Sequence, residues 1–150
     1  MKTVFDQKTR EELVARIHLL EDKSKPLWGK MNVYQMARHS VVWNEWVLGT
    51  NDVVYKQELL GKLFGRLALK SNTKNDKPIG RNMPAGKAFT IKEKDGDLKL
   101  QKKSWTDLII AYQHFSNDAF IHDFFGKMTK EQIGIFAYKH ADHHLRQFGV

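Results

Sequence analysis

Apolar residues recur every three to four positions along much of this chain, and this spacing favours a fold built from helices. The pattern is clear near the N-terminus, where Leu13, Ile17 and Leu20 form the stripe of a helix predicted over residues 6–22. Because 150 residues are close to the usual length of one domain and can bury a sizeable core, we expect a single domain over residues 1–150.

Two other helices have recognisable start signals. Asn32 followed by Gln35 has the spacing of a capping box, and Thr129 followed by Gln132 has the same spacing. The first pair predicts a helix that continues to a stop at Gly49. The second pair predicts a last helix that runs nearly to the C-terminus.

The middle of the chain is less regular. Residues 53–69 are read as an extra helical segment weakened by two glycines, and Ser104 begins another predicted helix that ends near residue 118. The intervening loop contains the helix breakers Pro78, Gly80, Pro84 and Gly86. Within it, AFTIKEKDGDLKL alternates apolar and polar residues around Asp95-Gly96, which predicts a β-hairpin.

These patterns predict an all-α fold, a bundle of four main helices. An extra helical segment and a basic loop with a β-hairpin are inserted between its second and third main helices. Eleven Lys and Arg but only four acidic residues lie in residues 66–103, which therefore carry +7 of the formal net charge of +8. Such a local excess indicates a basic flap or a solvated loop, and with Phe89 as its only aromatic residue we do not expect a nucleic-acid partner.

Composition also restricts the location of the protein and its chemistry. No apolar run approaches the ~18 residues that a membrane-spanning helix needs, and the polar start MKTVFDQKTR lacks the apolar stretch of an export signal. We therefore expect a cytoplasmic protein with no membrane partner. The chain has no cysteine, which excludes disulfides, thiolate zinc sites and a cysteine nucleophile, so a metal site must use His and carboxylates.

Three histidines lie within five positions near the C-terminus, in KHADHHLRQFGV. At about 100° per residue, His140 and His144 lie on the same helix face as Ile133 and Phe136, while His143 lies at the edge of that face. His140 and His144 are also i, i+4 neighbours with Cβ atoms roughly 5–6 Å apart. This spacing allows two imidazoles to reach one ion.

The second predicted helix offers a third imidazole. His39 lies in phase with Trp43 and Trp46 on an inward, aromatic stripe. A histidine in such a place is often only a hydrogen-bonded core residue. Combined with His140 and His144, however, it can complete a three-His metal site across the bundle. Three neutral ligands leave a coordination position free, as in catalytic rather than structural sites.

The other polar residues offer no clear catalytic base. Ala141 stands where the general base of an HExxH protease would be, and Asn44, Glu45 and Asp142 point off the ligand face. The expected nucleophile is therefore a metal-bound water or a thiolate. The remaining histidines lack comparable neighbours and are read as surface or core residues; they are His18, His114 and His122.

Two stretches resemble the DinB/YfiT-like superfamily of metal-dependent enzymes. WGKMNVYQMARHS, residues 28–40, is similar to its second-helix motif, and HADHHLRQFG is similar to its last-helix signature of two histidines followed by glutamine. The resemblance covers essentially the whole chain. It implies an up-down-down-up four-helix bundle, often a homodimer, in which His39, His140 and His144 hold a divalent metal ion, typically zinc or nickel.

The resemblance also implies a class of chemistry. Characterised relatives include transferases and isomerases that use low-molecular-weight thiols such as bacillithiol or mycothiol. Our leading hypothesis is therefore a metal-dependent thiol S-transferase or small-molecule hydrolase, with residues 66–103 either covering the metal pocket or forming a solvated loop. The alternatives are a non-enzymatic binding module that uses residues 66–103 for a polyanion, and a degenerate bundle that keeps the fold without activity.

Overall fold

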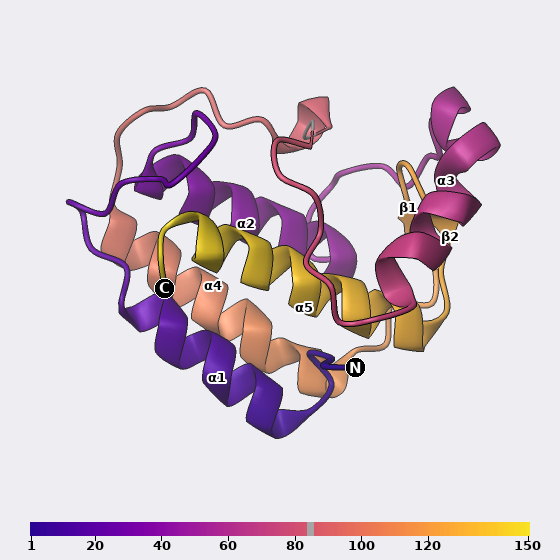
Figure 1. Ribbon diagram of the computed structural model, residues 1–150, viewed down its shortest axis with the longest axis horizontal. Coiled ribbons are helices and arrows are strands. Elements are labelled where there is room, and N and C mark those ends of the chain that lie inside the picture. Colours follow the sequence, from indigo (N-terminus) through magenta and orange to yellow (C-terminus); the bar gives the residue numbers. More distant parts are fainter. Residues whose placement is uncertain (84–85) are drawn as a thin grey trace.

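The computed structural model describes residues 1–83 and 86–150 and is mostly helical (Figure 1). Its elements are α1 (Gln7–His18), α2 (Val33–Leu48), α3 (Leu59–Thr73), the 3₁₀ turn η1 (Lys87–Phe89), α4 (Leu98–Ala111), the 3₁₀ turn η2 (Tyr112–His114), β1 (Ile121–His122), β2 (Gly126–Lys127) and α5 (Lys130–Gln147). This mostly helical content confirms the helical fold class predicted from the sequence. In the described parts of the chain, none of the helices has the length and hydropathy needed to cross a bilayer.

Helices α1, α2, α4 and α5 lie alongside one another around a common core (Figure 1). In the same view α1 and α5 run in one direction, and α2 and α4 run in the other. The largest fully buried side chains include Trp46, Trp105 and Tyr112. Helix α3 lies apart, against α5 and the short β1–β2 pair.

The two predicted capping boxes are confirmed, and they fix the helices that carry the candidate ligands. The Asn32 side chain accepts from the backbone N–H of Gln35 at 2.8 Å, and the Gln35 side chain accepts in return. Gly49 ends α2 with φ at 75°, a left-handed conformation that glycine adopts without strain. Thr129 and Gln132 form the same reciprocal pair at the start of α5.

The predicted β-hairpin around Asp95-Gly96 is wrong. Asp97 caps a helix instead, because its side chain accepts from the backbone N–H of Leu100 at 2.9 Å, so α4 begins at Leu98 and not at Ser104. The residues after Asp97 bury a helical stripe, Leu98, Gln101, Trp105 and Ile109. The alternation that suggested strands was a helix start next to an extended loop, and the strand pair forms at Ile121–His122 and Gly126–Lys127.

The sequence had suggested that the basic residues 66–103 form a single loop or flap, but they do not. Their first part belongs to α3, which covers Leu59–Thr73 and not 53–69, and their last part belongs to α4. Lys102 is turned toward the end of α1, where its ammonium donates to the carbonyls of His18, the last residue of that helix, and of Leu20. Pro84, one of the predicted loop breakers, lies outside the described residues.

The segment that follows α3 crosses α5 on its way to η1 (Figure 1). Buried Lys139 of α5 holds this segment, since its ammonium donates to the carbonyls of Asn72, Asn75 and Lys77. Farther along, the guanidinium of Arg81 lies 4.2 Å from the centre of the Trp28 ring. The crossing segment therefore passes directly beside the C-terminal half of α5, where the histidines lie.

Candidate metal centre

Helices α2 and α5 bring three imidazoles together in the interior. His39 of α2 and His140 and His144 of α5 each offer a ring nitrogen, and these three nitrogens all lie within 4.8 Å of one another. The side chains are between 4% and 8% exposed. Their convergence follows from the i, i+4 spacing on α5 and from the packing of α5 against α2.

A backbone carbonyl fixes the tautomer of His39. Its Nδ1 lies 2.8 Å from the carbonyl oxygen of Phe89, the last residue of η1. A carbonyl can only accept, so Nδ1 carries the proton and donates it. The Nε2 atom of His39 is then left with a lone pair that points into the cluster, as a metal ligand requires.

A chain of hydrogen bonds holds His144 in a similar way. Its Nδ1 lies 3.0 Å from the side-chain oxygen of Gln147, and the Gln147 amide nitrogen donates to the carbonyl of Trp28 at 2.8 Å. Gly29 makes room for this amide, because a Cβ at that position would lie 2.6 Å from the Gln147 nitrogen. With Nδ1 donating to Gln147, the Nε2 atom of His144 also keeps its lone pair for a ligand.

His140 is held by stacking rather than by a hydrogen bond on its outer nitrogen. Its ring lies 4.0 Å from that of Trp43 at an interplanar angle of 19°. Its Nδ1 is buried without a hydrogen-bond partner, and its Nε2 lies 3.2 Å from the Nε2 of His39. A buried polar nitrogen without a partner costs free energy. The two Nε2 atoms face each other at hydrogen-bond distance, so a cation between them would take the place of a proton shared there.

Burial keeps the three imidazoles neutral. Removal from water lowers the pKa of His140 and of His144 well below the usual range, and the neighbouring imidazoles lower both pKa values further. Burial also lowers the pKa of His39, although its hydrogen bond to Phe89 opposes this effect. Neutral imidazole is the form that binds metal ions, so the ligands are ready at neutral pH.

The cluster could hold a metal ion. A tetrahedral ion with bonds of ~2.0–2.1 Å needs ligand nitrogens separated by roughly 3.3 Å, close to the 3.2 Å between His39 and His140. Across residues 1–83 and 86–150, no further His or carboxylate joins the three imidazoles. Such a centre leaves at least one coordination position for an exogenous ligand.

The remaining polar candidates lie where the helix phases predicted. His143 stays at the edge of the cluster, with its ring 5.7 Å from that of Trp28. Asp142 pairs with Arg16 at 2.8 Å, and Asn44 accepts from the Tyr112 hydroxyl, so neither reaches the cluster. Among the other histidines, His18 and His114 are exposed, and His122 is a buried core residue.

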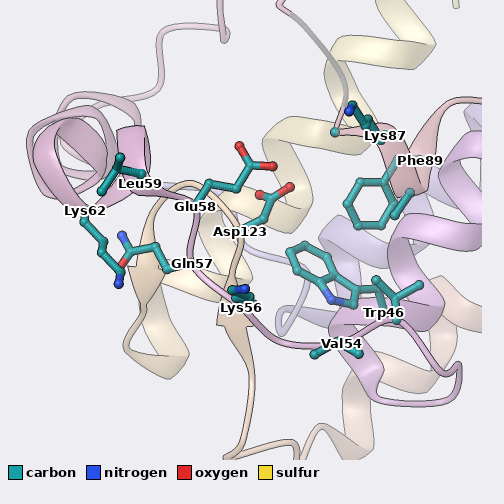
Figure 2. A pocket seen from close by; sticks show the side chains of 13 residues that line it. Trp46, Val54, Lys56, Gln57, Glu58, Leu59, Lys62, Lys87, Phe89 and Asp123 are labelled. Carbon is teal, nitrogen blue, oxygen red and sulfur yellow. The ribbon is translucent and has the colours of Figure 1, made fainter.

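A pocket of about 640 Å³ lies beside the centre but does not contain the three histidines. Figure 2 shows Glu58 and Asp123 on one wall and Phe89 on the other, above Trp46. The two sites share Phe89, whose ring faces the pocket and whose carbonyl binds His39. No residue pattern in the sequence predicts this link, because the acceptor is a backbone atom of a short 3₁₀ turn.

Comparison with known proteins adds a family but no chemistry. A protein-family model described as "Protein of unknown function (DUF1569)" matches residues 5–149, which include all three histidines. No curated protein matches the chain, and no solved structure does.

Proposed function

Since the chain belongs to the DUF1569 family of proteins of unknown function, we propose a function from the site alone: a metal-dependent enzyme that acts on small molecules. One observation carries the proposal. Three buried, neutral imidazoles converge without a fourth protein ligand among the described residues, and hydrogen bonds orient two of them. Structural sites surround their ion with four protein ligands, whereas this arrangement leaves a position for a reacting molecule.

The proposed metal is zinc or nickel, held by His39, His140 and His144. Imidazole ligands suit both ions, and a site without thiolates or carboxylates keeps the full positive charge of the ion. When bound, such an ion supplies Lewis-acid activation of a thiol or of water. Because the histidine motifs resemble those of enzymes that use low-molecular-weight thiols, we propose a thiol S-transferase with such a thiol as cosubstrate, or a small-molecule hydrolase.

The residues around the centre have separable tasks. Phe89 and Gln147 orient the imidazoles through hydrogen bonds, and Trp43 stacks on His140 and limits its rotation. Arg81 lies beside Trp28 at the edge of the cluster and gives that edge a positive charge. A cation at this edge favours an anionic thiol or substrate over a neutral one.

We propose that the fold is the DinB-like bundle that the sequence motifs resemble. The opposite directions of the α1/α5 and α2/α4 pairs in Figure 1 support an up-down-down-up order. The placement of one histidine on α2 and two on α5 supports the same assignment. Residues 1–150 would then form one such domain.

Elemental analysis of protein purified without a metal-affinity tag tests metal binding directly. We expect about one equivalent of a divalent metal in the wild type, a loss of metal in His39→Ala and in His144→Ala, and retention in the neighbouring control His143→Ala. A protein that stays metal-free after incubation with zinc or nickel salts would contradict the proposal. Circular dichroism of each variant separates loss of the site from loss of the fold.

Cobalt substitution then distinguishes the two reaction types. If a thiol occupies the free position, adding a low-molecular-weight thiol to the cobalt-loaded protein produces a thiolate-to-metal absorption band. A hydrolase would instead cleave small ester or amide substrates without added thiol. A metal-loaded protein that shows neither behaviour would be a degenerate bundle without activity.

A further inference from the structure

Helix α3 leaves a continuous apolar face in solvent. Five side chains, each between 56% and 76% exposed, cover the first two and a half turns of the helix: Leu59, Leu60, Leu63, Phe64 and Leu67. At about 100° per residue they occupy one sector of the helix, which we call the α3 apolar face. Isolated exposed leucines are common, but a contiguous group of this kind marks an interaction site.

The α3 apolar face cannot turn inward, because the opposite face of α3 is already packed against the rest of the protein. Gly61, Gly65, Leu69 and Thr73 are buried. A Cβ at Gly65 would lie 2.1 Å from the carbonyl oxygen of Phe124, and a Cβ at Gly61 would lie 2.3 Å from the same atom. The glycines thus let the helix backbone sit directly on the loop between β1 and β2, and that contact directs the α3 apolar face outward.

A row of cations borders the α3 apolar face. Lys62, Arg66, Lys70 and Lys74 follow one another at i, i+4 spacing and are all exposed. No acidic residue occurs between Glu58, at the start of the helix, and Asp76, beyond its end. The helix therefore combines a leucine- and phenylalanine-rich face with a strip of positive charge, and Figure 1 places it at one end of the molecule.

We propose that α3 binds the surface of an anionic lipid bilayer, with the α3 apolar face inserted at the headgroup boundary and the basic row against the lipid phosphates. Helices with this combination of an apolar and a cationic side lie in the plane of the interface. Nucleic acid would use the cations but leave the five apolar side chains in water. The prediction of no membrane partner came from the lack of a spanning segment, which a surface helix does not need.

A second copy of the chain fits the α3 apolar face less well. Two such faces in contact would bring two rows of cations together and leave their charges opposed. The face is also one helix wide and, at two and a half turns, roughly 13 Å long, so its area is small compared with the ~800 Å² that each partner buries in a stable interface.

Vesicle co-sedimentation of the full chain tests the proposal. We expect binding to phosphatidylcholine vesicles that contain phosphatidylglycerol and little binding to pure phosphatidylcholine. The double variant Leu63→Gln/Leu67→Gln should lower the partition coefficient on the order of tenfold or more, since glutamine keeps the helix propensity but not the apolar surface. The control Leu100→Gln, at a leucine on α4 that is 53% exposed, should bind like the wild type.

The charge requirement is tested with Lys62→Gln/Arg66→Gln, which should weaken binding roughly fivefold for each cation removed. Circular dichroism and the melting temperature of each variant should match the wild type, because all four side chains are exposed. Absence of binding to the anionic vesicles, or binding that does not change in the Leu63→Gln/Leu67→Gln variant, would overturn the proposal. So would sedimentation velocity that shows a dimer lost in this variant, because the face would then belong to a second copy.

Discussion

Single hydrogen bonds orient two of the three imidazoles for a metal, those of His39 and His144. His144 owes its orientation to Gln147, whose amide spans the distance between Nδ1 of His144 and the carbonyl of Trp28. Partners of this type, which hold the outer nitrogen of a ligand histidine, typically change metal affinity by 10–100-fold when removed. They act without touching the ion themselves.

The variant Gln147→Leu tests this role. Leucine fills a similar volume but cannot accept the Nδ1 proton of His144, so we expect zinc affinity to fall by roughly 10–100-fold. A competition titration with a chromophoric chelator measures the change. His143→Gln provides the control, because His143 lies beside His144 at the edge of the cluster and should leave the affinity unchanged. Equal affinities in wild type and Gln147→Leu would show that the hydrogen bond is dispensable.

The buried imidazoles also predict how stability depends on pH. In the unfolded chain a histidine titrates near pH 6.5, but burial lowers the pKa of His140 and His144 well below this value in the folded protein. As the pH falls below 6.5, the unfolded state takes up protons that the folded state cannot, so folding is destabilised. The contribution of these two neutral histidines to stability is fully present above pH 6.5 and is lost in more acidic solution.

Urea denaturation of the metal-free protein at about pH 7.5 and about pH 5.5 measures this effect. We expect roughly 1 kcal/mol less stability at the lower pH for each group whose pKa lies well below it. His140→Gln removes one such group and should show a smaller difference between the two pH values. A wild-type protein whose stability is the same under both conditions would contradict the assignment of neutral, buried imidazoles.

The sequence was sufficient to select the histidines but not the groups that orient them. His39, His140 and His144 were identified because helical phase and spacing are properties of the sequence, and Gln147 lies in the same phase. The carbonyls of Phe89 and Trp28 were missed because every residue has a carbonyl. Only the three-dimensional path of the chain decides which carbonyl lies beside a histidine 50 positions away.

At the scale of the elements, one buried ammonium holds the end of α3 and the segment after it in position. Lys139 donates to three backbone carbonyls from residues 72–77, and burial lowers its pKa. The three carbonyls partly replace the water that the charge loses. This interaction ties the end of α3 to α5 one residue away from His140.

Replacing Lys139 with methionine should release this connection. The three carbonyls would lose their donor, and we expect a loss of about 2 kcal/mol in the free energy of unfolding. Hydrogen exchange should become faster in residues 72–83 than elsewhere, which mass spectrometry of peptic fragments can localise. The exposed Lys70→Met variant on α3 is the control and should exchange like the wild type. Unchanged protection of this segment in Lys139→Met would rule out the proposed connection.

The close contact between α3 and the β1–β2 loop leads to a second prediction at the scale of the elements. Alanine normally favours a helix over glycine by about 1 kcal/mol, but a Cβ at Gly65 would lie 2.1 Å from Phe124 O. We expect the clash to prevail and Gly65→Ala to destabilise the protein by roughly 1–3 kcal/mol, measured by thermal or urea denaturation. Gly80→Ala, where the nearest side-chain atoms lie 4.0 Å away, should change stability little. A stabilised Gly65→Ala protein would show that α3 does not pack this closely.

Helix boundaries were predictable where capping residues mark them and unreliable elsewhere. The boxes at Asn32 and Thr129 located α2 and α5 to within a residue. The start of α4 was missed because Asp97 lacks the partner three residues later that completes a box, while the alternation before it imitates a strand. The extent of α3 was shifted because neither end carries a sequence signal: Glu58 makes no side-chain cap hydrogen bond, and the helix ends at Lys74 without a glycine.

On the scale of the whole molecule, an apolar stripe in a sequence does not reveal what covers it. The leucines of α3 have the same spacing as those of core helices, and only the position of the helix shows that they face solvent. The positive charge of residues 66–103 is similarly divided among α3, the crossing segment and α4. The prediction of a single basic flap over the metal centre was therefore too simple, although Arg81 does lie at the edge of that centre.

A metal ion in the proposed centre would join two helices that are distant in the sequence. His39 and His140 are separated by 101 positions, so a shared ion would act as a cross-link between α2 and α5. An ion that binds only the folded state stabilises it by mass action, by about 2.7 kcal/mol when free zinc is about a hundred times Kd. For a protein of this size, that corresponds to a rise of roughly 5–10 °C in Tm.

Thermal denaturation of chelator-treated protein with and without added zinc or nickel measures this rise. Because a His→Ala change can itself lower Tm, the informative quantity is the metal-induced shift within each variant. The shift should disappear in His39→Ala, which removes the only ligand on α2, and persist in His143→Ala, which leaves both helices connected. A shift that survives in His39→Ala would mean that the metal binds α5 alone or elsewhere, and that it does not hold the two helices together.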